Sequence, residues 1–144
     1  MSISNKNVDM LVFGLGQDGI VMSEHLSNRG IECMVLEKNR VAEAWRTCRW
    51  DSLVANGSCW HDKFPNLDCP HDLKCFVPHN EIDESFKNYA KMIDAPVKTG
   101  VDIQTIVKNK NKKGFMVETN NKVLRKSIAK YKTYKNIISA INWL

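Results

Sequence analysis

The sequence predicts an α/β fold, with one domain built on a parallel sheet and a small antiparallel meander placed before the last strand. Two observations lead to this fold. Residues 8–38 run from an apolar strand through a glycine-rich turn and an amphipathic helix to a second apolar strand, which is the order of a β-α-β unit. Residues from about 97 to 127 contain short runs that alternate between apolar and polar residues, as antiparallel strands do. The 144 residues, 43% of them hydrophobic, suffice for a single domain with one core.

The β-α-β unit is the most clearly marked element. Every residue of 8–13 except Asp9 is apolar, which suits a strand that is buried on both faces. The helix after the glycine turn is expected to end at Gly30, because glycine readily adopts the left-handed conformation that terminates helices. Residues 31–38 form the second strand, which the short connection makes a parallel neighbour of the first.

The middle of the chain is predicted to contain two helices separated by a long irregular segment. Residues 41–47 are expected to form a short helix, whereas 49–79 are rich in turn residues, cysteines and prolines. A loop of this length in a compact domain is either functional or a misassigned element, and the sequence leaves both open. Asn80, followed three residues later by Asp83, indicates the start of a helix that ends near residue 92 or 93.

The second half of the chain is predicted to form strands. Three alternating runs, at 101–107, 114–119 and 122–127, are expected to pair antiparallel, with a pair of asparagines as the second turn. Residues 135–141 are largely apolar and are expected to add the last strand.

Composition argues against several classes of partner. The formal charge of +5 comes mostly from lysines in the second half, and no aromatic residues interleave the run 108–113 to stack on bases, so we interpret these lysines as solvated turns. No apolar run is long enough to span a bilayer, and no secretory signal is visible. Nucleic acids and membranes are therefore not expected as partners. Five cysteines without an obvious framework favour reduced thiols and a cytoplasmic location.

Cysteine and histidine gather in the irregular segment, at Cys59, His61, Cys69, His71 and Cys75. Zinc requires four such ligands in a tetrahedron, and the usual spacing of two cysteines separated by two residues is missing. We therefore interpret them as ordinary loop residues and expect no metal site. The same missing motif disfavours a disulfide reductase, and no local motif identifies a catalytic residue.

The glycine-rich turn predicts a nucleotide site. Its spacing is Gly14-x-Gly16-x-x-Gly19, which permits a sharp turn, room for a pyrophosphate beside the backbone and close packing of the helix on the sheet. Free N–H groups and the dipole at the helix start favour phosphate charge. Glu37 ends the second strand about 20 residues later, where its carboxylate can accept hydrogen bonds from ribose hydroxyls. Together these features predict a Rossmann-type dinucleotide site.

Asp18 argues against tight binding at this site. A negative charge about 6 Å from a phosphate costs roughly 2–3 kcal/mol at an effective dielectric constant near 20. Alternatively, the side chain points outward and stabilises the N-terminus of the helix.

A longer pattern connects this turn to a known family. The segment "VLEKNRVAEAWRTCRWDSLVANGSCW" at 35–60 is followed by Phe64-Pro65, by "FVPHNE" before a helix and by "GVDIQTIVKNKNKKGFMVETNNKV". Up to about Leu124 the chain resembles the N-terminal part of the flavin-containing monooxygenase family, which belongs to the flavoproteins with two dinucleotide-binding domains. The resemblance implies FAD rather than NAD, held within a single FAD/NAD(P)-binding domain that spans residues 1–144.

The resemblance also implies roles for individual residues. The glycine turn would hold the pyrophosphate, Glu37 and Lys38 would lie at the ribose, and Trp45, Arg46 and Asn56 would lie near the flavin. The implied cofactor-binding set is Gly14, Gly16, Gln17, Asp18, Gly19, Glu37, Lys38, Trp45, Arg46 and Asn56. As alternatives, Trp45 is a core aromatic and Asn56 is a loop residue bonded to its own backbone.

The sequence also departs from the family. Ala42 and Ala44 stand where glycines are usual, and the chain reads "ISAINWL" where an alanine-threonine-glycine turn is expected. The seven glycines include no second fingerprint for NADPH, so we expect a fragment of a longer frame or a protein that works with a partner chain. The expected function is the FAD-binding portion of a flavin-dependent monooxygenase-like oxidoreductase, which in complete members performs NADPH-driven oxygenation. The alternatives are a non-catalytic or degenerate nucleotide-binding module and, less favoured, a basic interaction domain.

Overall fold

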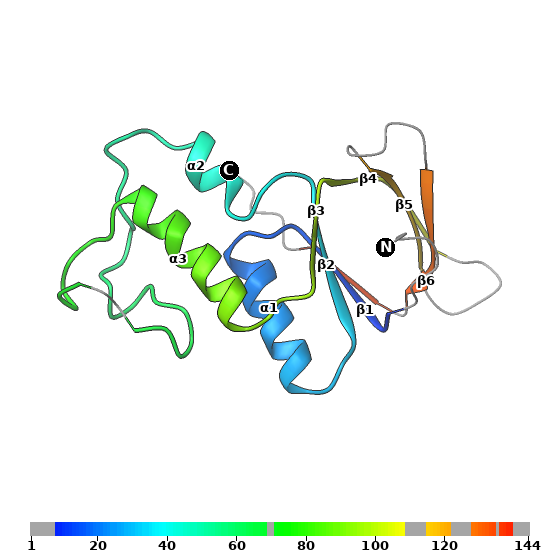
Figure 1. The fold of residues 1–144 in the computed structure, drawn as a ribbon, viewed down its shortest axis with the longest axis horizontal. Coiled ribbons are helices and arrows are strands. Elements are labelled where there is room, and N and C mark those ends of the chain that lie inside the picture. Colours follow the sequence, from blue (N-terminus) through cyan, green and yellow to red (C-terminus); the bar gives the residue numbers. More distant parts are fainter. Residues whose placement is uncertain (1–7, 69–70, 109–114, 122–127, 135, 140–144) are drawn as a thin grey trace.

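Three layers make up the molecule in the computed structural model, which describes residues 8–68, 71–108, 115–121, 128–134 and 136–139. The central layer is a parallel sheet in the order β3-β2-β1-β7, with helices on one side and an antiparallel sheet, β4-β5-β6, on the other (Figure 1). The strands of the parallel sheet are β1 (Met10–Phe13), β2 (Cys33–Glu37), β3 (Val97–Thr99) and β7 (Asn136–Ser139). The helices are α1 (Gln17–Asn28), α2 (Glu43–Thr47) and α3 (His79–Met92), and the meander consists of β4 (Val101–Lys108), β5 (Phe115–Asn121) and β6 (Ile128–Tyr134).

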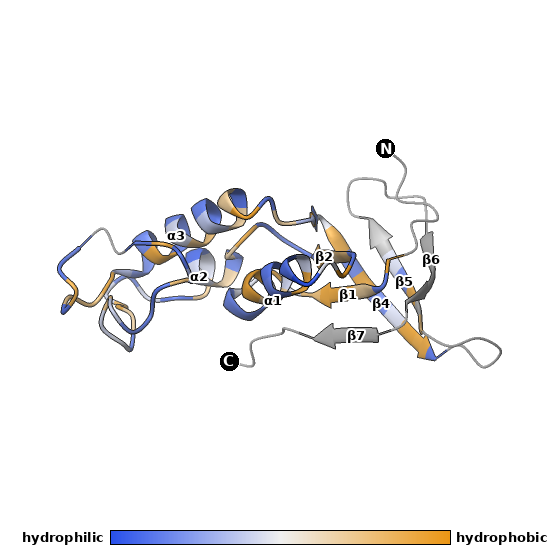
Figure 2. Ribbon diagram, turned by 90° about the horizontal axis from the view of Figure 1, so that it is seen from below, coloured by the Kyte–Doolittle hydropathy of each residue, from blue (hydrophilic) through white to orange (hydrophobic). Residues whose placement is uncertain are grey.

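Alternation along β1 and β2 separates two apolar cores. Leu11 and Phe13 of β1 pack toward the meander, where Val117 is buried with them, whereas Val12 packs on the helix side with Tyr89 of α3. Burying a side chain of this size contributes roughly 1.5–3 kcal/mol. Both faces of the parallel sheet are therefore covered, which agrees with the nearly continuous apolar sequence of β1, drawn in orange in Figure 2.

The predicted β-α-β unit is confirmed. β1 pairs in parallel with β2, in a register that places Met10 opposite Cys33. α1 ends as expected, because Gly30 adopts a positive φ of 67° and its N–H donates to the carbonyl oxygen of Ser27 at 2.9 Å. The carboxyl ends of β1 and β2 consequently lie side by side, and the glycine turn leaves β1 at this edge.

The prediction for the start of α3 is wrong in its detail. The helix begins at His79, with Pro78 at the N-cap position and no capping hydrogen bond from a side chain. Asn80 therefore lies within the first turn. Asp83 does not support a cap, because its carboxylate accepts hydrogen bonds from Arg46 and Lys87.

The meander is confirmed in kind and differs in position. The predicted asparagine turn is wrong, because Asn120 and Asn121 lie in β5, where Asn120 pairs with Ile128 of β6. The predicted third run, 122–127, falls outside the described residues, and the strand paired with β5 is Ile128–Tyr134. Residues 97–99 form β3 of the parallel sheet instead, with Gly100 at a positive φ of 74° at the turn before β4.

The predicted last strand is confirmed over residues 136–139, while 135, 140 and 141 lie outside the described residues. β7 pairs in parallel with β1, in a register that places Met10 opposite Asn136. β1 therefore lies in the interior of the sheet, between the second strand of the chain and the last one described.

The long segment between α2 and α3 is irregular, as predicted, and an isolated bridge joins Val54 to Pro78 near its ends. Cys33, Cys48 and Cys75 are free thiols. The expectation of reduced cysteines is wrong for Cys59, which is disulfide-bonded. Within the described ranges, no helix has the length and apolar character needed to cross a membrane.

Candidate functional site

A cleft of about 440 Å³ opens at the carboxyl ends of β1 and β2. Ligands of open α/β sheets bind at this edge, where strand connections leave in opposite directions. Here β1 has β2 on one side and β7 on the other. Of the predicted set, the cleft is lined by Gly14, Gly16, Glu37, Lys38 and Trp45.

The glycine turn has the backbone geometry that its sequence predicts. Gly14 adopts a positive φ of 89°, which favours glycine, and its N–H donates to the carbonyl oxygen of Leu36 at 2.9 Å. Gly16 is the N-cap residue of α1, and no side chain forms a capping hydrogen bond there. The start of the helix is therefore left for a ligand to cap, which is the arrangement that binds phosphate.

Glu37 joins the end of β2 to the glycine turn. Its Oε2 atom accepts a hydrogen bond from the Leu15 N–H at 2.8 Å, and its Oε1 atom accepts one from the Asn39 N–H at 2.7 Å. A carboxylate offers about four acceptor positions, so both oxygens keep the capacity to bind hydroxyl groups. The residue thus fixes the turn and also faces the cleft.

The charges around the cleft are partly neutralised by ion pairs. Lys38 lies 3.3 Å from the Asp102 carboxylate of β4, and Arg40 lies 2.6 Å from that of Glu43. Hydrogen bonds from the Arg40 guanidinium lower the pKa of Glu43 to about 2. Lys38 is thus near the ribose position that the resemblance implies, but it is held by an acid of the meander.

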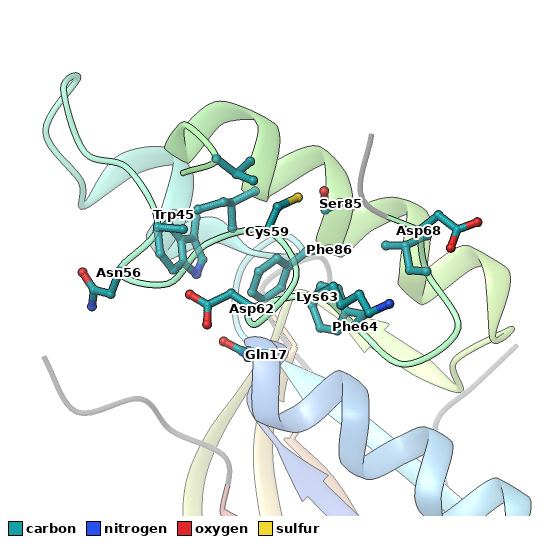
Figure 3. Close-up of a pocket in the computed structure, with 14 residues that line it drawn as sticks. Gln17, Trp45, Asn56, Cys59, Asp62, Lys63, Phe64, Asp68, Ser85 and Phe86 are labelled. Carbon is teal, nitrogen blue, oxygen red and sulfur yellow. The ribbon is translucent and has the colours of Figure 1, made fainter. Parts of the chain in front are cut away.

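Trp45 lies between this cleft and a second cavity of about 180 Å³, since it lines both. The second cavity is lined by residues of the long irregular segment, α2 and α3, with Gln17 at the start of α1 and Asn56 on its wall (Figure 3). Its floor is aromatic: the rings of Trp45 and Phe86 lie 6.2 Å apart between centroids, and Phe64 contacts Phe86 edge-on at 4.9 Å. The structure therefore brings Gln17, Trp45 and Asn56 together around one partly apolar cavity.

Arg46 lines neither of these two cavities. Its guanidinium is held by Asp83 of α3 through contacts of 2.8 to 3.2 Å, so it joins α2 to α3. Lys87 donates to the same carboxylate at 2.8 Å. Burial alone would raise the pKa of Asp83, but the hydrogen bonds from Lys87 and Arg46 outweigh it, and the pKa lies below its ordinary value. The geometry thus gives Arg46 a structural partner rather than a place at the cleft.

This pair makes the stability of the fold sensitive to acid. Because the pKa of Asp83 is depressed in the folded state, its contribution is fully present above the unfolded pKa of about 3.9 and is lost as the pH falls through the folded value. We expect the free energy of unfolding, measured in urea, to decrease below about pH 4. An Asp83→Asn variant should be less stable at pH 7 and should lose part of this pH dependence. An unchanged slope in the variant would contradict the role of this carboxylate.

The remaining predicted residues lie at the start of α1. Asp18 is exposed in the first turn and lines neither cavity, so its side chain takes the outward position that the sequence left open. Gly19 is buried where α1 packs on the sheet. Ala42 stands where the family that the sequence resembles usually has glycine. It adopts a positive φ of 55° and therefore carries the strain that glycine would avoid.

Arg49 lines the cleft and was not among the predicted residues. Its guanidinium carbon lies 4.9 Å from the centroid of the Trp45 ring. The available signal was the spacing of four residues from Trp45, which brings side chains together on a helix. α2 ends at Thr47, before this pair is complete, which weakened the signal.

Comparison with known proteins first gives sequence relatives. No protein-family model matches the chain. An uncharacterised oxidoreductase named CzcO-like, from Geobacillus kaustophilus, is 30% identical over 115 residues, which are 79% of this chain and 32% of that protein. The chain thus spans about a third of the length of the curated relatives it matches.

Solved structures share the fold. A bacillithiol disulfide reductase from Bacillus cereus superposes with a TM-score of 0.82 at 16% identity, covering 93% of this chain and 39% of that one. A flavin-containing monooxygenase from Stenotrophomonas maltophilia gives a TM-score of 0.74 at 18% identity, covering 96% and 38%. OTEMO, in complex with FAD and NADP, gives 0.71 at 15% identity, covering 94% and 26%.

These matches agree with the resemblance that the sequence predicted. In fold, the chain matches part of these larger structures, and in sequence it is similar to oxidoreductases named CzcO or CzcO-like over about a third of their length.

Proposed function

We propose that this chain is the FAD-binding portion of a flavin-dependent, monooxygenase-like oxidoreductase. One observation carries the proposal: the glycine turn, the uncapped start of α1 and the Glu37 carboxylate meet in one cleft of about 440 Å³ at the carboxyl edge of the sheet. This donor set suits a dinucleotide, since the helix start favours phosphate and the carboxylate favours ribose hydroxyls.

The residues would divide the cofactor between the two cavities. Gly14, Gly16 and the first N–H groups of α1 would hold the diphosphate, and Glu37 would hold the adenosine ribose. Gln17, Trp45 and Asn56, around the second cavity, would orient the flavin ring and exclude water from part of it. When bound, the flavin supplies the redox chemistry, which the protein positions and shields.

We propose NADPH-driven oxygenation only for a longer protein that contains this chain, or for a complex of this chain with a partner. The solved complex with FAD and NADP is matched over 26% of its chain, so a second nucleotide-binding domain, or a partner chain that provides one, would supply NADPH. A cytoplasmic location is likewise proposed, on the free thiols of Cys33, Cys48 and Cys75, although the disulfide at Cys59 departs from that pattern.

The test is flavin loading of the purified chain. We expect bound FAD to give a yellow protein, or the colourless protein to take up added FAD, with quenching of flavin fluorescence that fits a single site. Riboflavin, which lacks the adenosine and both phosphates, should bind at least about 100-fold more weakly, since it loses the contacts of the cleft. A folded chain that takes up no FAD would refute the proposal and favour the alternative, a non-catalytic or degenerate nucleotide-binding module.

Adding NADPH to the loaded protein then separates the two halves of the proposal. We expect NADPH not to bleach the flavin absorbance of this chain alone, and to bleach it once the longer protein or its partner is present. That result would support an NADPH site that lies outside this chain. Bleaching by NADPH with this chain alone would contradict it.

A further inference from the structure

Arg49 presents an unused hydrogen-bond donor in the wall of the cleft. Its Nε atom is shielded from solvent and has no hydrogen-bond partner among the described residues. The ion pairs found in those residues do not include Arg49, and the indole of Trp45 packs against its guanidinium at 4.9 Å. A buried donor without an acceptor is unfavourable, so this side chain points to an acceptor that the described part of the fold does not provide.

The charge balance of the cleft indicates what that acceptor is. Three carboxylates line the cleft, those of Glu37, Glu43 and Asp102, against two cations, Lys38 and Arg49. Lys38 is held by Asp102 at 3.3 Å. Glu43 is paired with Arg40 at 2.6 Å, so its charge is also neutralised. Arg49 is then the lining cation that no carboxylate of the described residues holds, and its charge attracts a phosphate group that enters the cleft.

We propose that Arg49 binds the diphosphate of the nucleotide that occupies this cleft, together with the start of α1. The inference rests on the proposed function, in which that nucleotide is FAD. A guanidinium offers a planar fork of donors that matches phosphate oxygens, and the Trp45 ring fixes its plane. Arg49 is thus a binding residue that offsets the carboxylates around it.

The experiment compares ligands that differ in phosphate content. Adenosine, ADP and FAD are titrated by calorimetry into the wild-type chain, Arg49→Gln and Arg49→Lys. Arg29→Gln is the matched control, because Arg29 is exposed at the end of α1 and donates to the carbonyl oxygen of His25. We expect Arg49→Gln to lower the affinities for ADP and FAD about 10-fold to 100-fold and to leave the affinity for adenosine unchanged, because the variant loses a charge-assisted contact to phosphate. Arg49→Lys should recover part of the affinity, and Arg29→Gln should change none.

The outcomes separate this inference from the flavin proposal. If the wild-type chain binds FAD, and Arg49→Gln binds ADP and FAD with the same affinities as the wild-type chain, the role of Arg49 is overturned and the flavin proposal stays intact. If Arg49→Gln lowers the affinities for adenosine, ADP and FAD by the same factor, the role of Arg49 at the diphosphate is also overturned, since Arg49 would then act only through packing on Trp45. If the wild-type chain binds ADP but not FAD, and the ADP affinity depends on Arg49, the diphosphate role stands and the flavin proposal fails. A folded chain that binds none of the three ligands overturns both.

Discussion

Glu37→Arg is expected to reduce FAD affinity at least about 100-fold, below detection in a fluorescence titration. In the proposed complex, two hydrogen bonds from ribose hydroxyls to the carboxylate would contribute roughly 1.5–3 kcal/mol each, and every 1.4 kcal/mol is a factor of ten in affinity. The substitution also removes the acceptor that holds the Leu15 N–H at 2.8 Å, so the glycine turn loses its attachment to β2. Both effects act on the same cleft.

Two further variants make this result specific. Glu37→Gln keeps the size and one acceptor oxygen, and we expect an intermediate loss of affinity. Glu84→Arg reverses an exposed charge on α3 that pairs with Lys87, outside both cavities, and should leave FAD binding unchanged. Circular dichroism shows whether each variant is folded. Wild-type affinity in a folded Glu37→Arg variant would remove the ribose assignment.

Tyr89→Ala is expected to lower the free energy of unfolding by about 3–5 kcal/mol, a large part of the stability of a domain of this size. Tyr89 is fully buried, and its ring stacks on Phe64 with centroids 4.4 Å apart and an angle of 13° between the planes. Its hydroxyl donates to the Glu24 carboxylate of α1. The side chain therefore joins α3, α1 and the long irregular segment, and truncating it leaves a cavity where the three meet.

Comparison with Tyr89→Phe separates the ring from the hydroxyl. The phenylalanine variant keeps the stacking and loses only the hydrogen bond to Glu24, so we expect a loss of about 1–3 kcal/mol. Both free energies are measured by urea unfolding at low temperature, where the alanine variant stays folded. Equal losses in the two variants would show that the ring contributes nothing beyond its hydroxyl, contrary to the packing described here.

Local patterns were sufficient to predict the β-α-β unit and the place of Glu37. The glycine spacing, the apolar strands and the acid at the end of β2 all lie within one continuous segment, so few long-range contacts are needed to interpret them. β3 was missed as a strand of the parallel sheet because three residues are too short to show a periodicity. Gly100 then separates it from β4, with which the sequence grouped it.

Long-range pairing explains the remaining differences at the site. Arg46 is engaged by Asp83, which lies 37 residues away in the sequence, and nothing in the local pattern couples the two. The unpartnered Nε of Arg49 is also a property of the folded chain, since burial depends on which segments cover it. The sequence therefore located the cleft but could not assign each charged residue to the cleft or to the scaffold.

The pairing of β7 with β1 also bears on how the protein is made. The neighbour that completes the environment of β1 is β7, the last described strand, so a nascent chain on the ribosome has made β1 long before β7 is translated. The entropic cost of closing a loop grows only with the logarithm of its length, so this long connection lowers the free energy of unfolding only slightly. Such non-local pairing nevertheless slows folding. Until synthesis passes residue 139, one side of β1 exposes unpaired main-chain groups, which is the period when the chain is most open to aggregation or to a chaperone.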